Sequence, residues 1–183
     1  MKKILIIIVA ALFVTAAQSQ VTKATLQASG LTCAMCSKAV YKALSSVPFV
    51  EKVQANIQQS SYDLNFKPGS TVDFDALSKA VVNAGFSVSM LKITTNFSNA
   101  KVQNDAHITL NEQTFHFLNV SSQTLQGERT ITLLDKNFVT AKERKKYSRF
   151  TTMKCYETGV MADCCKDPDA KKIAGTRVYH VTI

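Results

Sequence analysis

The chain lacks the motifs that mark most enzyme classes. Its 183 residues contain no H-E-x-x-H, P-loop or dinucleotide-binding glycine pattern and no Ser–His–Asp set. The carboxylates are scattered, without a pair suited to acid–base catalysis. Histidine is scarce, and His107, His116 and His180 fall in strand-like patterns far apart in the sequence, so we assign them to no site. The sequence gives no reason to expect an enzyme.

Long hydrophobic runs are also missing, except at the N-terminus. There Lys2 and Lys3 precede the apolar stretch Ile4–Val14, and small and polar residues follow as far as Ser19. This is the layout of a secretory signal peptide. The run is too short to span a bilayer, which needs roughly 20 apolar residues. We therefore predict a signal peptide over residues 1–19, a periplasmic or secreted mature protein, and no membrane span after cleavage.

A basic face interleaved with aromatic residues is absent as well. The formal net charge is +9 at pH 7, and much of the excess lies in the run "KERKKYSR" at residues 142–149. Nucleic-acid binding would favour a basic face spread along an element that carries aromatic residues. We interpret the run as a solvated helix surface, and we expect no nucleic-acid partner.

The first part of the mature chain shows a regular order of hydrophobic periods. Periods of two predict strands and periods near 3.6 predict helices. The predicted elements are strand 24–28, helix 40–47, strands 53–57 and 62–66, helix 74–84 and strand 86–90. Each strand is apolar on one face, so both helices must cover the same side of one antiparallel sheet. This βαββαβ order predicts an α+β, ferredoxin-like domain over residues 20–94.

The rest of the chain predicts a second, β-rich domain. Residues 95–105 have little periodicity and are predicted to form a linker. Residues 106–183 then contain a hairpin at 108–120, a strand at 128–135, a capped basic helix from 140, a short helix at 167–175 and a final strand at 176–183. Several short strands with small helices predict a small β-barrel-like, OB-like domain.

The segment "GLTCAMC" places Cys33 and Cys36 between the first strand and the first helix. At a helix start, unpaired N–H groups and the helix dipole favour a thiolate and lower the pKa of Cys36. Two soft sulfurs without a nearby third ligand suit Cu(I) or another thiophilic ion, whereas Zn(II) prefers four ligands. Low coordination also lets a thiolate of a partner enter, so that metal can pass by ligand exchange.

With this fold order around it, "GLTCAMC" resembles the heavy-metal-associated domain of copper chaperones, copper-pumping ATPases and the periplasmic mercury-binding protein. The resemblance covers about residues 22–93, and it implies that Cys33 and Cys36 are the metal thiolates. The family's usual methionine is Leu31 here, which should pack beneath the loop in the same way. Phe86 lies where ATPase modules and bacterial homologues often carry an aromatic residue.

The resemblance to the periplasmic copper- and mercury-binding type also implies a function. It implies a protein that binds Cu(I), with Hg(II) as the alternative metal. It further implies a metal-transfer partner such as an efflux pump or transporter, and either a monomer or a dimer bridged by a shared metal.

Two other interpretations of the pair remain open. Thiol–disulfide oxidoreductases also place C-x-x-C at a helix start, but they usually carry Trp before the first cysteine and Pro between the two. Here the residues between the cysteines are Ala34 and Met35, and Trp is absent. The pair could instead be a permanent disulfide in an adaptor protein. We expect Met35 to be an exposed loop residue rather than a ligand.

A second cysteine group lies near the C-terminus. Five cysteines are an odd number, and an oxidising compartment favours disulfides. We predict that Cys155 is bridged to Cys164 or Cys165. The alternative is a second soft-metal site, to which further donors could contribute, namely Met153, Met161 and His180.

Overall fold

The computed structural model describes residues 21–162, 165 and 175–183. The predicted signal peptide and nearly all of the helix predicted at residues 167–175 lie outside the described residues. Within the described part of the chain, no helix has the length and apolar character needed to cross a membrane.

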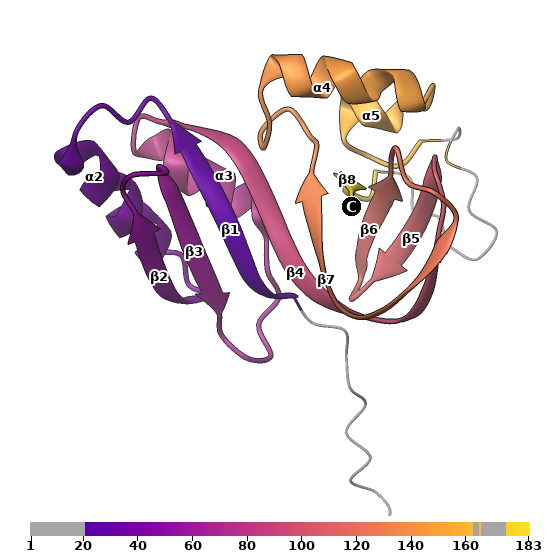
Figure 1. The fold of residues 1–183 in the computed structure, drawn as a ribbon, viewed down its shortest axis with the longest axis horizontal. Coiled ribbons are helices and arrows are strands. Elements are labelled where there is room, and N and C mark those ends of the chain that lie inside the picture. The colour runs from indigo at the N-terminus through magenta and orange to yellow at the C-terminus, as the bar shows by residue number, and fades with distance from the viewer. Residues whose placement is uncertain (1–20, 163–164, 166–174) are drawn as a thin grey trace, which may run out of the picture.

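The first six elements follow the predicted βαββαβ order, which is confirmed (Figure 1). Strands β2, β3, β1 and β4 are neighbours in that order, all antiparallel, and the two helices cover one face of them (Figure 1). These elements are β1 (Val21–Ser29), α2 (Ala34–Ser45), β2 (Val50–Asn56), β3 (Ser61–Phe66), α3 (Phe74–Asn83) and β4 (Ser87–Val102).

Local sequence explains where α3 begins and ends. The side chain of Asp73 accepts a hydrogen bond from the backbone N–H of Ala76 at 3.2 Å, which satisfies one of the open donors of the first turn. The helix is followed by Gly85 at φ +89, a left-handed conformation that glycine adopts without steric cost. The helix is therefore capped by side chain at one end and by glycine at the other.

Strand β4 continues through the segment that was predicted to be a linker, so that prediction is wrong. The strand has 16 residues and pairs with β1 on one side and with β7 on the other. Thr95, Phe97 and Val102 are buried, and the burial pattern is interrupted around Asn99, which has φ +53 at a register shift. The bulge and the polar residues beside it interrupt the alternation of apolar and polar residues, so the sequence pattern does not reveal this part of the strand.

The second half adds strands to the same sheet. The hairpin of β5 and β6 and the strand around Ile131 are confirmed, and α4 buries none of its residues, as expected of a solvated helix. The elements are β5 (Ala106–Leu110), β6 (Gln113–Phe117), β7 (Gln123–Leu133), α4 (Ala141–Tyr147), a 3₁₀ turn (Ser148–Phe150), α5 (Cys155–Thr158) and β8 (Val178–Thr182).

The predicted β-barrel is wrong, because the sheet is open. Its eight strands have the order β2-β3-β1-β4-β7-β8-β6-β5. Strand β8 lies between β7 and β6, antiparallel to the former and parallel to the latter. Since β4 belongs to both halves, the second set of strands extends the first sheet and does not curl into a barrel of its own.

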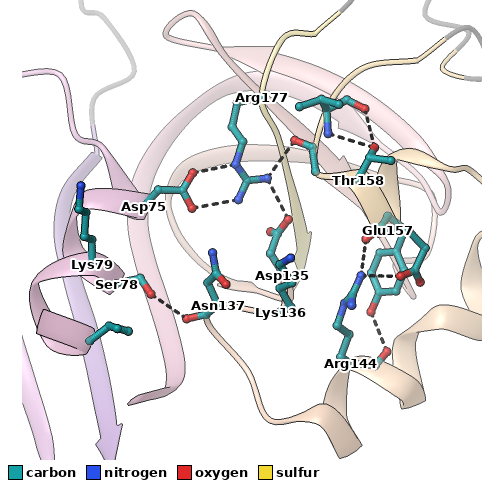
Figure 2. Close-up of a pocket in the computed structure, with 14 residues that line it drawn as sticks. Asp75, Ser78, Lys79, Asp135, Lys136, Asn137, Arg144, Glu157, Thr158 and Arg177 are labelled. Carbon is teal, nitrogen blue, oxygen red and sulfur yellow. Dashed lines mark hydrogen bonds and ion pairs between the residues drawn. The ribbon is translucent and has the colours of Figure 1, made fainter. Parts of the chain in front are cut away.

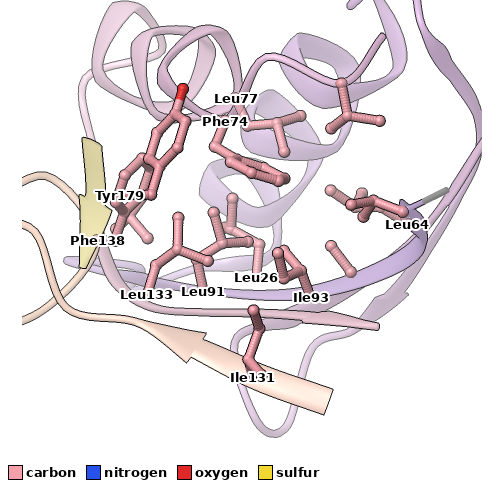
Figure 3. Close-up of a cluster of buried hydrophobic side chains, with 14 of the residues drawn as sticks. Leu26, Leu64, Phe74, Leu77, Leu91, Ile93, Ile131, Leu133, Phe138 and Tyr179 are labelled. Atoms are coloured by element: carbon pink, nitrogen blue, oxygen red, sulfur yellow. The ribbon is translucent and has the colours of Figure 1, made fainter. Parts of the chain in front are cut away.

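The largest hydrophobic cluster among the described residues contains side chains of both halves (Figure 3). Phe74 of α3 is fully buried, and its ring meets that of Tyr179 edge-on, with the centroids 5.0 Å apart. The ring of Phe115 lies 6.4 Å from that of Phe74. Such pairs contribute beyond the burial of their area, so the helix of the first half is held directly by strands of the second.

Arg177 also links the halves (Figure 2). Its guanidinium donates to both carboxylate oxygens of Asp75 on α3, at 2.8 and 3.1 Å, and to Asp135 Oδ1 at 3.0 Å. Asp135 is buried and accepts two further hydrogen bonds from His180. Burial alone would raise the pKa of the Asp135 carboxyl, but the bonds from His180 and the charge of Arg177 outweigh it and lower the pKa.

Replacing Arg177 by methionine should lower the free energy of unfolding by about 3 kcal/mol or more, because the buried Asp135 loses its counter-charge. The matched Asp75→Asn change removes a partner that is 38% exposed and should cost less than about 1 kcal/mol. Urea unfolding of both variants measures the difference. Because the folded-state pKa of Asp135 is lowered, its contribution is present above about pH 4 and is lost as the pH falls further. If Arg177→Met loses as much unfolding free energy below about pH 4 as above it, this account is contradicted.

Candidate metal centre

Cys33 and Cys36 lie where the chain passes from β1 into α2. Cys33 is the N-cap of the helix, and its Sγ accepts a hydrogen bond from the backbone N–H of Cys36 at 3.3 Å. Sulfur thus occupies the place that a serine or aspartate oxygen takes in most helix caps. The first turn of α2 therefore holds both thiols on the same side of the loop.

The loop rests on the core beneath it. Leu31 and Phe86 are partly buried and pack against the core, which confirms the expectation for Leu31. Gly30 has φ +86, and a side chain there would start 3.8 Å from the Phe86 ring. From the other side, the buried hydroxyl of Tyr62 donates to the carbonyl of Ser37 at 3.1 Å. These contacts fix the base of the loop and leave its tip exposed.

The two sulfur atoms are close together and accessible. Their Sγ atoms are 2.7 Å apart, Cys33 is exposed and Cys36 is half-buried. The pKa of the Cys36 thiol is lowered, chiefly by a hydrogen bond from the Cys33 thiol and next by the backbone of Thr32. A lowered thiol pKa increases the thiolate fraction, which is the form that binds metal or attacks a disulfide.

No third His, Cys, Asp or Glu ligand lies near the pair in the part of the chain that the structure describes. Among the described residues, the one group of three or more His, Cys, Asp or Glu side chains able to share an ion does not include Cys33 or Cys36. Met35, between them, is 73% exposed. The arrangement can therefore hold an ion through two thiolates with open positions beside it.

The sequence matches the family model of the heavy-metal-associated domain over residues 25–87. This part of the chain is a heavy-metal-associated domain. The match begins within β1, includes the cysteine loop, both helices, β2 and β3, and ends at the first residue of β4, so the rest of β4 and the strands that follow lie outside it. A comparison with curated proteins finds no match.

Solved structures of heavy-metal-associated domains are similar to part of the chain. A copper binding domain from HMA7, a P-type ATPase, is 31% identical, with 37% of this chain and 90% of that chain covered and a TM-score of 0.34. Oxidized MerP from Ralstonia metallidurans CH34 is also 31% identical, with 38% and 96% covered and a TM-score of 0.35.

The second cysteine group differs from its prediction. Cys155 and Cys165 are both buried and carry thiols, so the predicted disulfide between them is wrong, and Cys164 lies outside the described residues. The Sγ of Cys155 instead lies 3.6 Å from His107 Nε2 and 3.8 Å from His116 Nδ1. A buried thiol beside two ring nitrogens has polar partners, so it does not need a disulfide to be accommodated.

Sequence reasoning missed His107 and His116 as candidate site residues. Each lies in a strand, and His116 stands between the core residues Phe115 and Phe117. The signal that could have found them is a polar residue flanked on both sides by apolar residues within a predicted strand. Burial, followed by the nearby His107 and His180, lowers the pKa of His116 to about 3, so its ring is neutral near pH 7.

Replacing Cys33 by alanine should raise the pKa of the Cys36 thiol, because the bond from Cys33 is the largest cause of its lowering. Cys33→Ser is the matched control, since a hydroxyl can still donate and should keep part of the effect. The pH dependence of iodoacetamide alkylation at Cys36, followed by peptide mass spectrometry, measures both. Equal alkylation profiles for the alanine variant and the unmodified protein would contradict this origin of the shift.

Proposed function

We propose that this protein is an exported heavy-metal-binding protein that binds Cu(I) through Cys33 and Cys36 and passes it to a partner. The observation that carries the proposal is an exposed pair of thiols, at the start of a helix, within a heavy-metal-associated domain. The signal-like sequence of residues 1–19 supports export.

The donor set favours a soft ion of low coordination number. Thiolates select soft ions such as Cu(I), and the pair lacks the four ligands of a structural zinc site. A linear ion about 2.3 Å from each sulfur would hold the two sulfurs about 4.6 Å apart, so they must separate from their present 2.7 Å on binding. The exposed tip of the loop allows this without repacking the core. Hg(II) has the same preference and is the alternative metal.

Exposure of the loop also favours transfer. A thiolate from a partner can approach the ion while Cys33 and Cys36 still hold it, and the exposed Met35 lies beside the entry point. The partner is a metal-transfer protein such as an efflux pump or transporter. The protein acts as a monomer, or as a dimer when two such loops share one ion.

One observation supports a second candidate, a thiol–disulfide oxidoreductase. The short distance between the sulfurs and the lowered pKa of Cys36 are also what disulfide exchange requires. Insulin reduction separates the two functions. A metal carrier should reduce insulin no faster than dithiothreitol does, whereas an oxidoreductase should be faster.

The reduced protein should bind one more equivalent of Cu(I) than the Cys33→Ser, Cys36→Ser variant, because the serine hydroxyls are poor ligands for a soft ion. Titration against a chromophoric Cu(I) chelator measures the stoichiometry and the affinity. Met35→Ala is the matched control and should bind as the unmodified protein does, since the side chain is exposed. Equal binding by the double-serine variant would reject the proposal, and stronger competition by Hg(II) than by Cu(I) at the same sites would favour the alternative metal.

A further inference from the structure

Three histidines form a row across neighbouring strands of the second half. The strand registers pair His107 of β5 with His116 of β6, and His116 with His180 of β8. His107 is 8% exposed, and the other two are fully buried. The rings of His107 and His116 are stacked, with centroids 4.2 Å apart, and the ring of His180 lies 5.1 Å from that of His116. Buried imidazoles thus replace apolar side chains across three adjacent strands.

Helix α5 places a thiol against this row. The donor atoms of His107, His116 and Cys155 all lie within 4.8 Å of one another, and the two sulfur–nitrogen distances are 3.6 and 3.8 Å. A tetrahedral ion with sulfur at about 2.3 Å and nitrogen at about 2.0 Å separates those donors by about 3.5 Å. The sulfur–nitrogen spacing of the cluster is therefore close to that of a metal site, and the stacked rings of His107 and His116 must rotate for both nitrogens to face one ion.

Carboxylates orient two of the imidazoles. Asp105 lies 2.9 Å from His116 Nε2, which leaves Nδ1 of that ring for the side where Cys155 lies. Asp135 binds His180 through Nδ1 at 3.0 Å. Ligating histidines commonly bind a carboxylate through the other ring nitrogen, because this fixes the tautomer and raises the basicity of the ligand.

His180 supplies a further nitrogen donor in the row. Its Nε2 is buried and has no hydrogen-bond partner among the described residues. A buried polar atom left in this state is destabilising, and a polar ligand in the row would remove the penalty. His180 is not among the three residues whose donor atoms lie within 4.8 Å of one another, so it lies beside the cluster and is not counted as a ligand.

The surroundings of Cys155 are dry and rich in sulfur. Cys155 packs in a buried cluster with Met161, Cys165 and Val178, and Met153 lies against the same cluster. Thioethers and thiols are soft and polarizable, and their presence around a site disfavours hard ions that need oxygen ligands or water.

We propose that His107, His116 and Cys155 bind one thiophilic transition-metal ion, of the copper or zinc class, at a second site separate from Cys33 and Cys36. Cys155 loses its proton when the ion binds, and the two imidazoles bind as neutral rings. The cysteine loop and α5 lie on opposite sides of the molecule, so one ion cannot be shared between the two sites (Figure 1). The buried three-donor site retains its ion, whereas the exposed pair can exchange.

The test uses the full chain with Cys33→Ser and Cys36→Ser, so that its outcome is independent of the first site. Reduced protein is titrated separately with Zn(II), Cu(I) and, as a spectroscopic probe, Co(II). We expect one equivalent to bind, a higher melting temperature with metal, and a thiolate-to-cobalt charge-transfer band. Whichever of Cu(I) and Zn(II) is bound more tightly is the ion that the site prefers.

Cys155→Ala and Cys165→Ala form the matched pair in this background. Each removes a fully buried sulfur from the same cluster, so the cost of the cavity is similar, but only Cys155→Ala should abolish binding. X-ray absorption of the zinc-loaded double-serine protein needs no core substitution and should show one sulfur and at least two imidazole nitrogens. Absence of binding in the double-serine protein, equal binding by the two alanine variants, or a shell of oxygen and nitrogen alone would overturn the proposal.

Discussion

The whole molecule depends on the hydrogen bonding of one strand, β4. Its first part pairs with β1 and so completes the heavy-metal-associated domain, and most of its length pairs with β7 and so begins the second half. A backbone shared in this way leaves the halves no independent orientation. Phe74 and Arg177 add a buried aromatic contact and an ion pair across the same boundary. The cysteine loop is therefore carried on a rigid body much larger than the matched domain.

The two clusters of soft donors differ in what surrounds them. Cys33 and Cys36 lie on a loop whose base is packed and whose tip is open, which suits an ion that must leave again. Cys155 lies buried at the start of α5, beside His107 and His116, and the other ring nitrogen of His116 binds the carboxylate of Asp105. Under the two proposals, the exposed pair exchanges its ion and the buried cluster retains it, because burial limits the access of competing ligands.

The sequence was sufficient for the elements that are local and amphipathic. Periods of two and 3.6, with caps such as Asp73 and Gly85, predict βαββαβ because each helix and strand there has one buried face. The candidate pair was also visible, since Cys33 and Cys36 are three residues apart in the sequence. The sequence did not predict the geometry around them, namely the cap formed by Cys33 and the short distance between the two sulfur atoms.

The second half was less predictable for physical reasons. The final strand was predicted and is confirmed as β8, but its place in the sheet was not predictable, because its pairing with β6 is parallel and distant in sequence. The bulge at Asn99 interrupts the alternation of β4, so this part of the strand was predicted to be a linker. His107 and His116 are adjacent because of a hairpin, but the approach of Cys155 depends on tertiary packing that no local pattern encodes. The disulfide was predicted because an oxidising compartment favours disulfides, since the sequence does not show where the thiols lie.

The insertion of β8 between β6 and β7 has a consequence for the order of folding. The gap between β6 and β7 is filled only by the last strand of the sequence, and the pairing of β1 with β4 in the heavy-metal-associated part joins segments at least as far apart. Closing so large a loop is slow relative to local pairing. Until β8 pairs, β6 is an edge of the sheet, so the buried row of His107, His116 and His180 forms only when the last strand of the sequence is in place.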